Sequence, residues 1–204
     1  MFPLEVPPGT TLGTLFSDVL PKVHAQMVPA SAGAERYVVV QRIEGFETYT
    51  FEIRGPKLEV RVGAADKPDF WVLVPRANVE LFLDDWLGPK RLVPKSVPKE
   101  IVAVSDPRIL KRLAMVSSKT ELALTDLDGR RVSLTAASGA AAKKPIEADD
   151  PDVVLEADAD TFLRVVEGSL PPEDAIADGA ITVRGKRLLA MQLALAFAPF
   201  YPKR

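Results

Sequence analysis

Two stretches decide how this chain is expected to fold, because they repeat one pattern. Residues 68–88 read PDFWVLVPRANVELFLDDWLG, and residues 151–171 read PDVVLEADADTFLRVVEGSLP. Each begins with Pro-Asp, continues as a short apolar run typical of a strand, and then spaces its apolar residues as an amphipathic helix does. The two Pro-Asp pairs lie 83 residues apart, too far for a solenoid repeat. The sequence therefore predicts a duplicated α+β unit.

The pattern extends to both sides of these two stretches. Upstream, residues 48–63 and 120–139 each predict a strand, a tight turn and a strand, with Gly55 and Gly129 in the turns. These glycines lie 74 residues apart rather than 83. Downstream, residues 100–116 and 180–196 each predict a strand followed by an apolar helix. In the first half, residues 48–54 and 57–62 alternate between apolar and polar side chains. This alternation is typical of antiparallel strands that have one face on the core and one face exposed to solvent.

The duplication predicts two domains, residues 1–106 and residues 107–204. We expect each to form a mixed, mainly antiparallel sheet with helices on one face, and a pseudo-twofold axis to relate the two. The second unit is shorter, because it lacks counterparts for an amphipathic helix at 12–27 and for a strand at 37–43. Pro21 is expected to kink or restart that helix.

Composition excludes several classes of protein. The chain has 204 residues, enough for one large domain or two of about 100. A net charge of −2 gives no general attraction to nucleic acid or to an anionic membrane. The absence of cysteine excludes disulfides and fits a reducing cytoplasm. No signal peptide is apparent, and no uncharged apolar run is long enough to span a bilayer. We expect a cytoplasmic protein.

The polar residues suggest no catalytic or metal site. His24 is the one histidine, and we expect it to be partly exposed on its helix. The acidic residues around 147–152 lack the spacing of a calcium loop and are expected to be solvated. Asp158 and Asp160 precede an apolar helix, so capping explains them. Phosphate-loop motifs do not occur. The prediction is therefore no catalytic residue, no metal and no cofactor. Residues 138–145 (SGAAAKKP) are expected to form a mobile loop.

The C-terminal segment is apolar almost all round, from Leu188 to Tyr201. Such a helix is either buried in the core or covers an apolar ligand. Because one sheet face cannot bury all of it, we expect a cavity in the second unit, with the helix at 160–167 as the opposing wall. The residues expected to line it are Phe162, Val166, Leu189, Leu193 and Phe197, with Gln192 near a polar headgroup.

The order of these elements resembles the sterol carrier protein-2 family. The motifs are GPKLEVRVGAADKPDF and NVELFLDDWLG in the first half, and PDVVLEADADTFLRVVEGSLPPEDAIADGAITVRGKRLLAMQL in the second. In the second half Gly168, Gly179, Val183 and Gly185 match the family pattern, whereas in the first half Ser105-Asp106 replaces its Arg-Gly pair. The resemblance implies a mixed five-stranded sheet per unit, with an apolar tunnel between sheet and helices. It implies no catalytic residues.

Three functions are consistent with this sequence. The leading hypothesis is a non-catalytic carrier for a fatty acyl chain, a sterol or a similar lipid. The alternative is an enzyme, such as an isomerase or cyclase, that acts on an apolar small molecule in the same cavity. Its polar candidates would be His24, Tyr49, Gln192 and Tyr201. The third is an interaction module whose cavities have closed. The second unit also lacks a complete set of strands, and it is expected to complete its sheet with help from the first.

Overall fold

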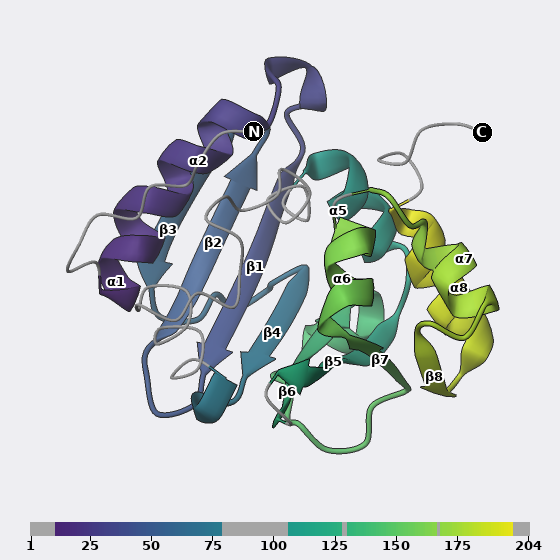
Figure 1. Ribbon diagram of the computed structural model, residues 1–204. Coiled ribbons are helices and arrows are strands. Elements are labelled where there is room, and N and C mark those ends of the chain that lie inside the picture. The colour runs from purple at the N-terminus through teal and green to yellow at the C-terminus, as the bar shows by residue number, and fades with distance from the viewer. Residues whose placement is uncertain (1–10, 79–105, 128–129, 167, 198–204) are drawn as a thin grey trace.

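The computed structural model describes residues 11–78, 106–127, 130–166 and 168–197. The described strands form one eight-stranded sheet in the order β3-β2-β1-β4-β6-β5-β7-β8 (Figure 1). The strands are β1 (Arg36–Ile43), β2 (Thr48–Arg54), β3 (Lys57–Val62), β4 (Phe70–Val74), β5 (Ser118–Leu127), β6 (Arg130–Ser138), β7 (Val153–Asp158) and β8 (Thr182–Gly185). The helices are α1 (Leu12–Thr14), α2 (Leu20–Met27), α5 (Pro107–Ala114), α6 (Ala159–Val166), α7 (Pro172–Ala177) and α8 (Arg187–Ala196), with short helical turns η1 (Leu15–Val19), η2 (Ala30–Ala32) and η3 (Gly139–Lys143).

Helices cover one face of this sheet across both halves of the chain (Figure 1). In the first half, Leu15 and Phe16 of the first helical segment pack on Ile43, Tyr49 and Phe51. Leu110 of α5 packs on Tyr37, Ile53 and Phe70. In the second half, Leu193 of α8 packs with Val153 of β7 and Ile176 of α7. The expected α+β fold, a mixed sheet with helices, is confirmed.

The opposite face of the sheet is apolar only at its centre. Val40, Trp71, Leu73 and Ala137 form a cluster there, covered by Ala142 of η3 and by Ile146. The Arg42 Nη2 donates to the Ile146 carbonyl at 2.7 Å, which ties this cover to β1. The prediction of a mobile loop at 138–145 is therefore wrong: Ala142 is completely buried, because its small methyl group fits against the sheet.

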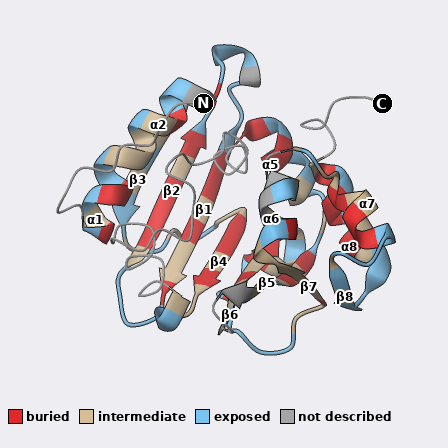
Figure 2. Cartoon of the chain, viewed as in Figure 1, coloured by how far each residue is buried: buried red, intermediate tan, exposed pale blue. Residues whose placement is uncertain are grey.

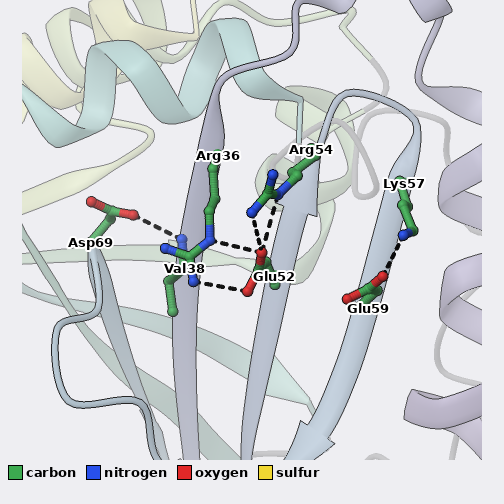
Figure 3. A network of polar contacts seen from close by, with 7 residues as sticks. All are labelled: Arg36, Val38, Glu52, Arg54, Lys57, Glu59 and Asp69. Atoms are coloured by element: carbon green, nitrogen blue, oxygen red, sulfur yellow. Dashed lines mark hydrogen bonds and ion pairs between the residues drawn. The ribbon is translucent and has the colours of Figure 1, made fainter.

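Ion pairs line the flanks of this opposite face. In the first half Glu52 lies between Arg36 and Arg54, and Lys57 pairs with Glu59 (Figure 3). Hydrogen bonds from the two arginines lower the pKa of Glu52 to about 2. In the second half Arg131 of β6 bridges Glu121 of β5 and Glu156 of β7. Charged side chains thus keep the uncovered parts of this face in contact with water.

The first helix is interrupted before Pro21. A five-residue π-helical turn, η1, separates α1 from α2, and Pro21 stands in the first turn of α2. Proline has no N–H to donate to the preceding turn, so the regular helical ladder breaks there. The expected restart at Pro21 is confirmed.

The pairing of the strands shows which elements of the two halves correspond. β4 runs parallel to β1, with Phe70 opposite Val39. β7 runs parallel to β5, with Val153 opposite Thr120. Each of β1 and β5 also pairs antiparallel with the strand that follows it. The counterpart of β5 is therefore β1. The predicted match of 120–139 with 48–63 is wrong by one strand, and the 74-residue offset was the sign of that error.

The expected pseudo-twofold axis is also wrong. β4 pairs antiparallel with β6, and β6 pairs antiparallel with β5, so β5 points in the same direction as β4 and β1. Helices cover the same face in both halves (Figure 1). A twofold axis would reverse either the strand direction or the covered face. The halves instead share one strand direction and one covered face.

Several elements differ from the sequence-based expectation or lie outside the described residues. α5 precedes β5 as α1 and α2 precede β1, so it takes the place of the opening helix that the second half was expected to lack. α7 was not predicted from the sequence, although Pro172 followed by Glu173 and Asp174 is a typical helix start. The expected helix after Asn78 and the expected strand at 101–104 fall outside the described residues.

Candidate functional site

The two Pro-Asp motifs form the same hydrogen-bonded clamp at the start of a parallel strand pair. The Asp69 N–H donates to the Val38 carbonyl at 2.8 Å, and the Asp69 carboxylate accepts from the Val38 N–H at 2.8 Å. In the second half, the Asp152 N–H donates to the Lys119 carbonyl at 2.8 Å and its carboxylate accepts from the Lys119 N–H at 3.0 Å. Each aspartate thus fixes the register of its strand against β1 or β5.

The second clamp also positions α8. The Asp152 carboxylate accepts from the Lys186 ammonium at 2.5 Å, and the Asp152 carbonyl accepts from the Lys186 N–H at 3.0 Å. The hydrogen bond from Lys186, followed by that from the Lys119 N–H, lowers the pKa of Asp152. Gly185 has φ +89°, and a Cβ there would lie 2.4 Å from the Asp152 carbonyl oxygen. Only glycine therefore allows the chain to pass this close to the clamp before α8 begins.

The structure brings together two of the predicted cavity residues. Leu193 is buried, and Leu189 packs partly buried in the same cluster as Val153, Ile176 and Ala190. In this cluster α8 lies against α7, β7 and the end of α5. These two leucines therefore contribute to the core of the second half.

The other predicted residues lie at the margins of that core. Phe162 is half-buried on α6, and Phe197 is half-buried at the C-cap of α8. Gln192 is exposed. The side chain of Val166 lies outside the described part of the structure. α6 packs on β5, β7 and α7, whereas α8 packs on α5, α7, β7 and β8. α7 therefore contacts both α6 and α8, and both of these helices lie against β7.

A strip of incompletely covered leucines crosses the helix-covered face beside α6. Leu122 of β5 lies opposite Leu134 of β6 and Leu155 of β7. Leu122 is 42% exposed, and the other two are half-buried. In Figure 2 the ribbon of α6, which lies over β5 and β7, mixes exposed, intermediate and buried residues. α6 lies against β5 and β7 and carries the half-buried Phe162 and Val165. This part of the second half therefore offers apolar surface that the described residues do not fully cover.

His24 is buried rather than partly exposed, which corrects the expectation from the sequence. Only 1% of it is accessible, and its Nε2 donates to the Gly55 carbonyl at 2.8 Å. Burial lowers the pKa of His24, while the hydrogen bond to Gly55 and the charge of Asp106 oppose that shift. His24 thus connects α2 to the turn between β2 and β3. Asp106, whose role was also not predicted from the sequence, is buried and caps α5 by accepting a hydrogen bond from the Arg108 N–H at 2.8 Å.

The acidic residues near 147–152 serve as structural partners. Asp149 pairs with Lys119 at 2.9 Å, and Asp152 forms the clamp described above. Asp158 accepts from the Thr161 N–H at 2.6 Å, which confirms its expected capping role and lowers its pKa. Among the residues that the structure describes, no three metal-ligating side chains come together.

Two shallow grooves lie on the first half, away from the predicted cavity residues. A groove of about 300 Å³ runs between the start of α1 and β3, lined by Thr14, Tyr49 and Val62 among others. Another of about 250 Å³ is lined by Glu52, Arg54, Lys57 and Glu59, the ion-paired side chains of Figure 3. Neither contains a residue expected to line the ligand cavity, although the first includes Tyr49, a polar candidate of the enzyme alternative.

Residues 99–198 match the model of the SCP-2 sterol transfer family. Solved structures similar to this chain include sterol carrier protein 2 of Yarrowia lipolytica in its apo form, at 18% identity and TM-score 0.34, over 44% of this chain and 73% of that one. Palmitated SCP2L2 of Aedes aegypti is 20% identical with a TM-score of 0.32, over 43% of this chain and 89% of that one. The sterol carrier protein domain 2 of Helicoverpa armigera is 19% identical with a TM-score of 0.36, over 53% of this chain and 86% of that one. Scores this low support no conclusion about function.

A comparison with curated proteins finds no match to this chain. Among the described helices, none has the length and apolar character needed to cross a membrane. The family match therefore bears most directly on function.

Proposed function

We propose that this chain is a non-catalytic binding protein for an apolar ligand, such as a fatty acyl chain or a sterol. The match of residues 99–198 to the SCP-2 sterol transfer family is the observation that carries the proposal. The incompletely covered apolar strip beside α6 supports it, because Leu122 remains 42% exposed on the face that helices otherwise cover. Each ligand methylene buried there would contribute about 0.8 kcal/mol, so a long acyl chain can reach micromolar affinity without a charged contact.

The proposed binding region lies in the second half, between the sheet, α6 and α8. We assign its lining to Phe162, Val166, Leu189, Leu193 and Phe197, with Gln192 at the polar end of the ligand. The half-buried state of Phe162 and Phe197 supports this assignment, because such side chains gain contacts when a ligand arrives. Gln192 lies exposed on the outward side of α8, so it would meet a headgroup that protrudes from this region into water.

Phe162→Ala and Phe197→Ala are the sharpest test of this site. Each should weaken binding of a fluorescent acyl probe about ten-fold or more, because each removes a large apolar contact. Phe46→Ala is the matched control, since Phe46 is an exposed phenylalanine in the β1–β2 turn. Leu193→Asp is less informative, because Leu193 belongs to the core and its loss would disturb folding. Unchanged binding in both folded α6 and α8 variants would place the site elsewhere.

Native mass spectrometry of the purified protein tests the function itself. The proposal expects copurified lipid, or uptake of fatty acid or sterol on incubation. A protein that stays empty and shows no thermal shift with either ligand would refute the carrier function.

The structure lends no specific support to the enzyme alternative. Tyr49 donates to the Glu47 carboxylate at 3.0 Å, and His24 donates to Gly55. Gln192 is exposed, and Tyr201 lies outside the described residues. The polar groups that could act on a bound ligand are thus engaged in structural contacts or turned to water, as far as they are described.

We also propose that the chain is a tandem of two sterol-carrier-like units, residues 1–106 and 107–204. The paired Pro-Asp clamps support a duplication, as does the common offset of 81 to 83 residues between Val38 and Lys119 and between Asp69 and Asp152. In this arrangement β6 serves both units. It pairs with β4 of the first unit and with β5 of the second.

A further inference from the structure

The outward side of α8 is apolar and exposed. Leu188 is 74% exposed and Leu195 is 51% exposed, and Gln192 between them is also exposed. Their spacing of four and three residues places them on one side of the helix. The opposite side, with Ala190, Leu193 and Ala194, packs into the core. α8 therefore has more apolar surface than the fold buries, and the surplus faces outward.

The outward side of α5 is basic. Arg108, Lys111, Arg112 and Met115 are all exposed and recur at the spacing of one helix face. Met115 is 80% exposed. Neither α5 nor α8 contains an acidic residue. A positive strip with an apolar end therefore lies on the helix that precedes β5.

These two sides adjoin. The Arg112 guanidinium donates to the Leu195 carbonyl at 3.4 Å, which brings the end of α5 to the end of α8. Both helices cover the same face of the sheet, so their outward sides both face away from it (Figure 1). We name the surface formed by Arg112, Met115, Arg187, Leu188 and Leu195 the α5–α8 surface.

The charge of this surface is only partly neutralised by its neighbours. Lys111 pairs with Glu35, and Arg108 pairs with Asp106. Arg112 and Arg187 make no ion pair within the described ranges. Two exposed cations therefore flank three exposed apolar side chains, in a chain whose overall charge is negative.

We propose that the α5–α8 surface docks on a lipid bilayer that contains anionic lipids. Surfaces that lie in a membrane interface typically combine exposed apolar side chains, such as leucine and methionine, with arginine or lysine. The apolar groups enter the boundary of the acyl chains, and the cations contact headgroup phosphates. A second copy of the chain fits less well, because the arginines of the two copies would then be brought together. The docking does not depend on a ligand in the proposed cavity.

Flotation with vesicles of phosphatidylcholine, with and without phosphatidylserine, tests this proposal. The whole chain should bind the phosphatidylserine vesicles and bind them less as salt increases. Arg112→Gln and Arg187→Gln should each weaken binding about five-fold on anionic vesicles. Leu188→Ser with Leu195→Ser should weaken binding at least as much, and should do so at high salt as well.

Matched controls lie on β3, at the far edge of the sheet. Arg61→Gln and Val62→Ser remove an exposed cation and a 62% exposed valine there, and should leave vesicle binding unchanged. Failure of the whole chain to bind anionic vesicles would overturn the proposal. The proposal would also be overturned if the leucine variants bound anionic vesicles as well as the unchanged chain does. It would likewise be overturned if the unchanged chain were a dimer that the leucine substitutions convert to a monomer. Acyl-probe binding without vesicles, measured on the same variants, separates a failure of docking from a failure of the ligand site.

Discussion

Removal of the Asp69 carboxylate should destabilise the protein more than removal of the corresponding Asp152 carboxylate. Asp69 accepts from the Val38 N–H, and Val38 is 1% exposed. In Asp69→Ala that N–H remains buried without its acceptor, which costs about 2 kcal/mol. Asp152 accepts from the N–H of the half-buried Lys119, where water can replace the lost oxygen. Asp152→Ala should therefore cost about 1 kcal/mol, including its exposed pair with Lys186.

Urea unfolding followed by circular dichroism measures this difference. Asp69→Asn keeps an acceptor oxygen and should recover much of the loss. Asp66→Ala is the control, because Asp66 is exposed just before the same Pro-Asp motif. If Asp69→Ala were as stable as Asp66→Ala, the Asp69 carboxylate would not hold β4 against β1.

Two further changes test contacts that fix the fold. Gly185→Ala should destabilise by about 2 kcal/mol more than Gly179→Ala in thermal unfolding: both glycines have positive φ, but only at Gly185 would the Cβ meet a carbonyl. Equal losses would mean that α8 shifts freely. Because burial lowers the pKa of His24, the unfolded chain binds its proton more readily, so stability should fall as pH drops below about 6.5. His24→Gln should remove that part of the pH dependence, and an unchanged profile would contradict it.

The sequence predicted those elements in which local pattern and tertiary role agree. β2, β3 and β4 lie where alternation or a short apolar run placed them, because every second side chain meets the helices. The C-terminal helix, expected at residues 186–198, is observed as α8 at Arg187–Ala196. The correspondence between halves was misplaced by one strand, because β2 and β5 have similar composition. Their difference is one of pairing: β5 has a parallel neighbour and β2 does not.

The polar contacts were largely out of reach of the sequence because they join distant residues. His24 lies between the half-buried Val23 and the exposed Ala25 in the chain, and only the approach of the β2–β3 turn makes it buried. The Pro-Asp pairs were visible as motifs, but their role needs the N–H of a strand about 31 residues earlier. For the C-terminal helix, the sequence was consistent with burial in the core or with a lid over an apolar ligand. The structure buries one side of α8 and exposes the other.

The common strand direction and covered face of the two halves have a consequence for the proposed function. A twofold pair would direct its units in opposite senses, whereas here the described α-helices of both halves cover the same face of the sheet. The proposed ligand region beside α6 and the α5–α8 surface therefore lie on one side of the molecule. The other side is closed by η3 at its centre and by ion pairs at its flanks. A ligand that left the region beside α6 toward a docked bilayer would thus not have to cross the sheet.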